Sequence, residues 1–177
     1  MANRKCIYLT EGECEAKLVR ALQEAPALVR AGKVKRFNVV QNELPASILM
    51  TFDPGSTVIL IFDSDTDFTE HLKVNLDKLR KQCAKVEVLT VAQVHSFEEE
   101  LEHATDVTKA QDLTQSESVS EFKSAVNRMN TTQFRRTLEN HHLDISKLWS
   151  KRPPKAFAFL TQGSDLVKTF GKQGVTP

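Results

Sequence analysis

Two short motifs rich in carboxylates each follow directly on an apolar stretch of the chain. EGECE comes after the run IYLT, and DSDTD comes after the run VILIF. Carboxylate oxygens that converge from separate elements are the hard donors that Mg²⁺ and Mn²⁺ prefer. The chemistry suggested is therefore that of a bound divalent metal, and its candidate ligands are Glu11, Asp63, Asp65 and Asp67. The alternative is that these acids lie on a solvated loop and hold no cation.

An alternation of strands and helices must position the two motifs. Apolar runs predict strands at 6–10, 33–40, 58–62 and 86–91, with helical periodicity between them. This order is typical of an α/β fold with a mainly parallel four-stranded sheet that helices cover on both faces. Ligands of such sheets bind beyond the carboxyl ends of the strands, where the chain order reverses, and the first and third strands are usually neighbours there. We therefore expect Glu11 and Asp63 to lie close together.

Other residues near these motifs allow two interpretations each. Gly12 either permits a positive φ or a close backbone approach where strand turns into helix, or is a plain turn glycine. Glu15 is either an auxiliary acid of the site or first-turn charge that complements the helix dipole. Glu98, after the fourth strand, is a further candidate metal ligand. It can equally be a first-turn glutamate of a helix capped by Ser96 and Glu99.

The pattern becomes mostly helical in the second half of the chain. SFEEEL and SVSEF both match a capping box, so a helix is expected to begin at Ser96 and another at Ser118. We therefore predict an α/β core over residues 1–95 and a helical extension over residues 96–177 that packs on it. The run AFAFLT additionally predicts a late strand at 155–161.

A strand that ends in EGxxE, followed by a later strand that ends in DxD, resembles the Toprim domain, which has a Rossmann-like fold. The EGxxE form is most similar to OLD-like and related phage-defence nucleases, and the resemblance covers about residues 5–95. It implies a Mg²⁺-dependent nuclease, or related phosphoryl transfer on nucleic acid. It also implies that Glu11 assists acid–base chemistry or metal binding, and that Asp63 and Asp65 coordinate Mg²⁺ or Mn²⁺.

The chain departs from that family in one respect. Many members continue the second motif as DxDxxG, whereas this chain has Asp67 and then Phe68, with no glycine. Either Asp67 serves as a substitute ligand, or the site has drifted away from catalysis. The alternative function is therefore a non-catalytic Toprim-like module that binds nucleic acid or a separate ATPase partner.

Charge is unevenly distributed along the chain. Residues 1–106 hold 13 Lys and Arg against 17 Asp and Glu, whereas residues 107–177 hold 11 against 6. A basic half beside an acidic half fits a phosphate-bearing partner, RNA or DNA, although ordinary surface variation would look the same. The candidate nucleic-acid-binding residues are Lys123, Arg135, Arg136, Lys151 and Arg152.

Composition limits the setting of the protein. Three scattered cysteines without a CxxC motif favour a reducing environment, and the chain contains no apolar run of membrane-spanning length. We therefore expect a cytoplasmic protein with no membrane partner. A chain of 177 residues often dimerises to build a binding channel, so a homodimer is a further expectation.

Overall fold

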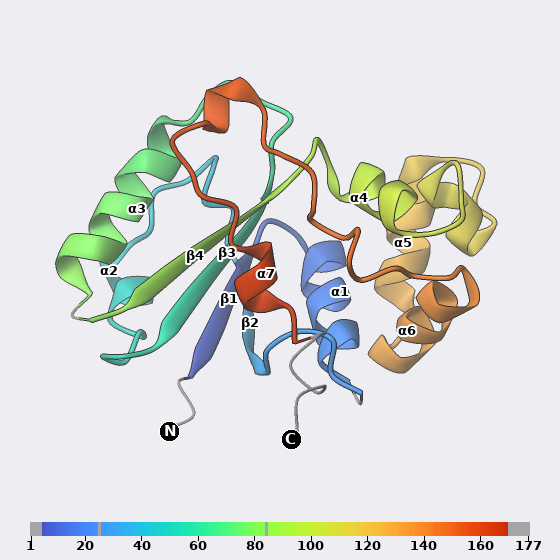
Figure 1. The fold of residues 1–177 in the computed structure, drawn as a ribbon, viewed down its shortest axis with the longest axis horizontal. Coiled ribbons are helices and arrows are strands. Elements are labelled where there is room, and N and C mark those ends of the chain that lie inside the picture. Colours follow the sequence, from blue (N-terminus) through green and yellow to red (C-terminus); the bar gives the residue numbers. More distant parts are fainter. Residues whose placement is uncertain (1–4, 25, 84, 170–177) are drawn as a thin grey trace, which may run out of the picture.

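The computed structural model describes residues 5–24, 26–83 and 85–169 (Figure 1). Four strands form one sheet in the order β2-β1-β3-β4, and every pair of neighbours is parallel. The strands are β1 (Cys6–Thr10), β2 (Gly32–Arg36), β3 (Thr57–Asp63) and β4 (Glu87–Gln93). The predicted α/β class and the parallel four-stranded sheet are confirmed. The chain order reverses between β1 and β3, as expected.

Helices cover both faces of the sheet, and a mostly helical region follows β4 (Figure 1). The α-helices are α1 (Glu13–Gln23), α2 (Ala46–Leu49), α3 (Glu70–Gln82), α4 (Phe97–Ala104), α5 (Val119–Arg128), α6 (Thr131–Asn140) and α7 (Ser164–Val167). Two 3₁₀ helices are η1 (Ala110–Thr114) and η2 (Lys155–Phe157). Within the described ranges, no helix is both long and apolar enough to cross a bilayer.

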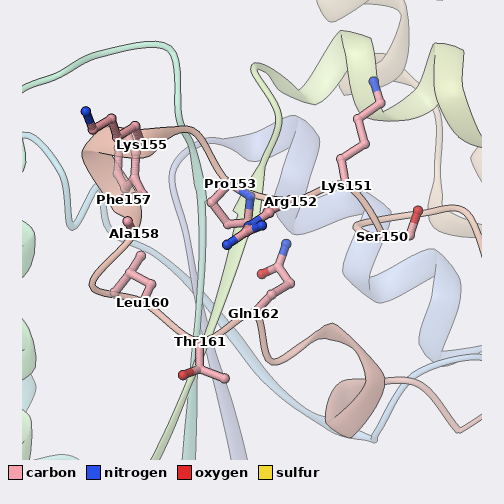
Figure 2. A pocket seen from close by; sticks show the side chains of 10 residues that line it. All are labelled: Ser150, Lys151, Arg152, Pro153, Lys155, Phe157, Ala158, Leu160, Thr161 and Gln162. Carbon is pink, nitrogen blue, oxygen red and sulfur yellow. The ribbon is translucent and has the colours of Figure 1, made fainter.

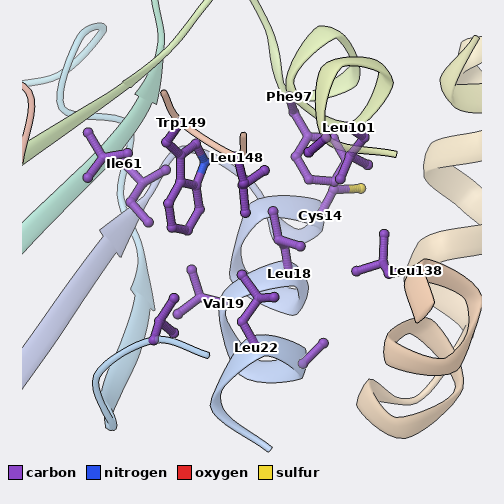
Figure 3. Close-up of a cluster of buried hydrophobic side chains, with 14 of the residues drawn as sticks. Cys14, Leu18, Val19, Leu22, Ile61, Phe97, Leu101, Leu138, Leu148 and Trp149 are labelled. Carbon is purple, nitrogen blue, oxygen red and sulfur yellow. The ribbon is translucent and has the colours of Figure 1, made fainter. Parts of the chain in front are cut away.

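The side chains of β3 alternate between two hydrophobic clusters, which is why its apolar run is unbroken. Val58, Leu60 and Phe62 pack with α2 and α3 on one face. Ile59 and Ile61 pack on the other face with α1 and with the helices that follow β4. Figure 3 shows this second cluster, in which α1 is enclosed between the sheet and the helical region. The end of β3 is therefore held from both sides.

Side-chain caps begin three of the later helices. Ser96 accepts a hydrogen bond from the amide of Glu99, and Ser118 does the same for Glu121, so α4 and α5 begin where the sequence predicts. Asn130 forms a capping box at α6 that was not predicted from the sequence.

The predicted strand at 155–161 is wrong. This segment forms η2 and a turn, in which Phe157 is buried and Phe159 is 44% exposed, although a strand would place both on one face. Phe157 instead stacks on Phe62, with ring centroids 5.8 Å apart. Gln162 takes the place of a strand residue at the edge of the sheet, because its side-chain amide bonds both the N–H and the C=O of Ala92 at 3.0 Å.

Two buried cations join α1 to the helical region. The ammonium group of Lys17 donates to the carbonyls of Val126, Asn127 and Met129 at the end of α5. The guanidinium of Arg135 donates to the carbonyls of Glu24 and Pro26 beyond the end of α1, and to Glu139 on its own helix. Each cation thus satisfies carbonyls that a helix end leaves without partners.

Lys17→Met is expected to lower the free energy of unfolding by about 2–3 kcal/mol, because three carbonyls lose a charged donor. The measurement is the urea midpoint at unchanged slope. Arg20→Met on the same helix is the control, since Arg20 forms only a half-exposed ion pair with Glu13 and its loss should cost less than about 1 kcal/mol. Equal midpoints for the two variants would contradict the role given to Lys17.

Candidate functional site

The two acidic motifs meet at the carboxyl end of the sheet, between β1 and β3. The backbone N–H of Asp63 donates a hydrogen bond of 3.2 Å to Oε2 of Glu11. Both residues, with Asp65, line a cleft of about 220 Å³ at this edge. The expectation that Glu11 and Asp63 lie close together is confirmed, and the position is the one where ligands bind in open parallel sheets.

Asp63 is the most perturbed acid of the cleft. Its Oδ1 atom is buried and has no hydrogen-bond partner among the described residues. Burial, followed by the negative charges of Glu15, Glu11, Glu98 and Asp65, raises the pKa of Asp63 to about 8. The carboxyl group therefore titrates near neutral pH, and among the described residues no cation forms an ion pair with it.

Glu15 lies close to this group of acids and also in the first turn of α1, so both interpretations of this residue stay open. Its side chain is only 6% exposed, and burial is the main cause that raises its pKa, with the charge of Glu11 adding to it. The backbone amides of Glu15 and Gly12 bond its carboxylate and partly offset this rise. Glu13, by contrast, forms ion pairs with Arg20 and Arg36 and lies outside the group.

Gly12 lies close to the carboxylate of Glu15, whereas its backbone angle does not call for glycine. Its φ is −132°, which any residue can adopt. A Cβ atom at this position would lie 2.7 Å from Oε2 of Glu15. Glycine therefore leaves room for the Glu15 carboxylate to fold back against the start of α1, toward Asp63.

Gly12→Ala is expected to displace the Glu15 carboxylate and thereby lower the pKa of Asp63 from about 8 toward its ordinary range. The pKa of Asp63 can be measured from its carboxyl carbon-13 chemical shift, recorded over a range of pH. The displaced group is the free end of a side chain, so stability should change by about 1 kcal/mol or less. In a Glu15→Ala background the same substitution should leave the pKa of Asp63 unchanged, because no carboxylate remains to be displaced.

Lys123 brings a positive charge to the edge of the acidic group. Its ammonium nitrogen lies 3.0 Å from Oε1 of Glu98, whose side chain is 12% exposed. Burial lowers the pKa of Lys123, but the close contact with Glu98 and the charges of Glu98, Glu15 and Asp63 outweigh it and raise the pKa. Lys123 thus pairs with an acid of the site, and its predicted binding of nucleic acid stays a prediction. No local sequence signal identifies this ion pair, since α5 reaches the site only by packing against α1.

The remaining predicted residues lie in different surroundings. Asp67 is exposed and does not line the cleft. Arg136 and Arg152 are exposed, and Lys151 is half-buried. Arg135 is only 8% exposed and its guanidinium is engaged by backbone carbonyls, so we no longer expect it to bind nucleic acid.

The donor atoms of the acidic group fit a hard divalent cation, because Glu11, Glu15, Asp63, Asp65 and Glu98 offer only oxygen ligands. The described part of the chain nevertheless contains no group of three His, Cys, Asp or Glu side chains already placed to hold a metal ion. Cation binding would therefore require at least one of these carboxylates to change its rotamer.

Comparisons with models of known protein families, with curated proteins and with solved structures found no match. The function of the site is therefore inferred from its own residues and their geometry.

Proposed function

We propose that the protein is a divalent-metal-dependent phosphodiester hydrolase that acts on nucleic acid. The observation that supports this most strongly is the buried Oδ1 atom of Asp63, which has no hydrogen-bond partner among the described residues and faces the charges of neighbouring carboxylates. Such an arrangement is unfavourable without a cation and becomes favourable with one. Its position at the reversal of chain order between β1 and β3 adds support.

The acids of the cleft would have different roles. Asp63 and Asp65 would hold Mg²⁺ or Mn²⁺, with Glu98 or Glu15 as a further ligand. A bound divalent cation would stabilise negative charge on the scissile phosphate. Glu11 accepts a hydrogen bond from the Asp63 amide and its pKa is raised by burial, so it is placed to orient an attacking water and take its proton. Asp67 is exposed outside the cleft and is not needed for this arrangement.

The experiment is hydrolysis of a small nitrophenyl phosphodiester and of labelled RNA and DNA, with Mn²⁺ and with EDTA. Calorimetric titration with Mn²⁺ alone provides a readout that does not depend on turnover. We expect Mn²⁺ binding that Asp63→Asn abolishes, together with hydrolysis that EDTA stops. Absence of Mn²⁺ binding by the folded protein would rule out this function.

A second candidate is a non-catalytic module that binds nucleic acid or a partner ATPase. The ion pair between Lys123 and Glu98 favours it, because an internal ammonium group already compensates part of the acidic charge. Under this alternative, the protein would bind nucleic acid without hydrolysing it, and Mn²⁺ would not bind. Lys123→Met separates the two candidates. It should raise Mn²⁺ affinity in a metal enzyme, whereas in the module it would only remove an ion pair and destabilise the fold.

A further inference from the structure

A pocket of about 670 Å³ lies in the loop formed by residues 150–162, here called the basic loop (Figure 2). Lys151, Arg152 and Lys155 line it, and none of its described lining residues is acidic. Across residues 5–24, 26–83 and 85–169, these three cations form no ion pair. The pocket is thus lined by three positive charges, of which Arg152 and Lys155 are exposed and Lys151 is half-buried.

The basic loop is firmly attached to the fold at three points. The amide of Trp149, directly before the loop, donates to Glu100 of α4 at 2.7 Å. Phe157 stacks on Phe62 of β3. The side chain of Gln162 bonds the backbone of Ala92 in β4, and also the carbonyl of Trp149 at 3.3 Å, which closes the loop on itself. A loop anchored in this way presents its charges in a fixed arrangement, which lowers the entropic cost of binding.

Two of these attachments place the basic loop at the carboxyl end of the sheet, where the acidic cleft also lies. Phe62, under Phe157, directly precedes Asp63 in β3. Glu100, which holds Trp149, lies two residues after Glu98 in α4. The basic loop therefore extends from the end of β3 toward α4. It lies at the carboxyl end of the strands, as the carboxylates do (Figure 1).

The three cations are spread along the loop and do not converge on one point. In Figure 2 the guanidinium of Arg152 points toward Gln162, whereas Lys151 and Lys155 extend toward opposite ends of the pocket. Lys151 also lies near enough to Glu100 to lower its pKa. A single phosphate is best bound by converging donors, whereas a row of cations matches the repeated charges of a polyanion.

From this arrangement we propose that the basic loop binds the phosphate backbone of a nucleic-acid strand whose scissile bond lies in the acidic cleft. The inference rests on the proposed function for the identity of the polyanion. It adds Lys155 to the predicted Lys151 and Arg152, and it places the strand along the β4 side of the molecule. Arg136, on α6, would lie outside this path.

The test is fluorescence anisotropy of a labelled single-stranded oligonucleotide with EDTA present, so that binding is measured without hydrolysis. We expect Arg152→Glu to raise the Kd at least about ten-fold at low salt, and the matched charge reversal Arg136→Glu to change it less than about two-fold. Both arginines are exposed, so both variants should fold. Joint replacement of Lys151, Arg152 and Lys155 by serine should reduce the slope of log K against log salt by about 2.

Three outcomes would overturn the proposal. The first is equal weakening by Arg152→Glu and Arg136→Glu. The second is displacement of the oligonucleotide by ATP or by a polyglutamate peptide as efficiently as by unlabelled oligonucleotide, since the pocket would then serve a small anion or an acidic protein. The third is the absence of oligonucleotide binding by the wild type. Mn²⁺-dependent cleavage of the small phosphodiester would still report on the proposed function in that case, so the two failures are distinguishable.

Discussion

Asp63→Asn is expected to reduce Mn²⁺-dependent hydrolysis by about 10³-fold, which corresponds to about 4 kcal/mol of activation free energy. The substitution keeps the size of the side chain and removes the charge that the cation would neutralise. Calorimetry should show the accompanying loss of Mn²⁺ affinity. Because Oδ1 is buried and has no hydrogen-bond partner among the described residues, removing the charge should not destabilise the metal-free protein.

Asp67→Asn is the matched control, since Asp67 belongs to the same acidic motif but is exposed and does not line the cleft. It should change hydrolysis and Mn²⁺ affinity less than about two-fold. Wild-type activity in Asp63→Asn would exclude catalysis at this site. A loss in Asp67→Asn as large as in Asp63→Asn would show that Asp67 does replace the missing glycine as a functional position.

The raised pKa of Asp63 also predicts how stability depends on pH without metal. The folded protein holds the proton up to about pH 8, whereas an unfolded chain releases it near the ordinary value of 3.8. Over that range the folded state binds more protons, so the free energy of unfolding falls as pH rises. Thermal unfolding in EDTA should show this fall in the wild type and a flatter profile in Asp63→Asn. Saturating Mn²⁺ should restore stability at pH 8 in the wild type only.

Local patterns in the sequence were sufficient to predict most of the sheet. The apolar run at 58–62 predicted a strand, and β3 contains these residues with side chains buried on both faces. The second strand was predicted at 33–40 but ends at Arg36. The side chain of Asn38 accepts hydrogen bonds from the amides of Val40 and Gln41 and turns the chain there. The buried Val39 and Val40 had extended the apolar pattern beyond the strand.

The acids at the strand ends could be predicted because topology alone brings β1 and β3 together. Glu11 and Asp63 follow from that rule. Lys123 and Arg135 could not be predicted in the same way, since their surroundings depend on how α5 and α6 pack against α1. Their charge suggested solvent and nucleic acid, whereas one pairs with Glu98 and the other is buried against carbonyls. Positive charge in a sequence therefore does not by itself identify a binding surface.

Glu100 has the largest expected effect on stability, because it joins three parts of the fold through one buried side chain. It is 0% exposed; Oε1 accepts from the amide of Val94 at 2.8 Å and Oε2 from the amide of Trp149 at 2.7 Å. Burial raises its pKa, and these two hydrogen bonds oppose the rise. The end of β4, helix α4 and the start of the basic loop therefore depend on this carboxylate.

Glu100→Ala is expected to lower the free energy of unfolding by about 3–5 kcal/mol, because two buried amides lose their acceptors and a cavity remains. Urea midpoints would measure it, and hydrogen exchange should show lost protection at Val94 and Trp149. Glu99→Ala is the control, since Glu99 makes only a 3.4 Å contact to the amide of His95 and its loss should cost less than about 1 kcal/mol. A wild-type midpoint in Glu100→Ala would contradict the assignment.

If Glu100→Ala does not fold, Glu100→Gln keeps the test available, because the amide retains one acceptor oxygen. It should be destabilised less than Glu100→Ala. The raised pKa of Glu100 means that the wild type loses stability as pH rises from the unfolded value of 4.5 toward the folded one, whereas the glutamine variant does not. The difference in the free energy of unfolding between the wild type and Glu100→Gln should therefore narrow as pH increases. If this difference instead widened with pH, the fold would stabilise the charged form of Glu100. That result would contradict the raised pKa.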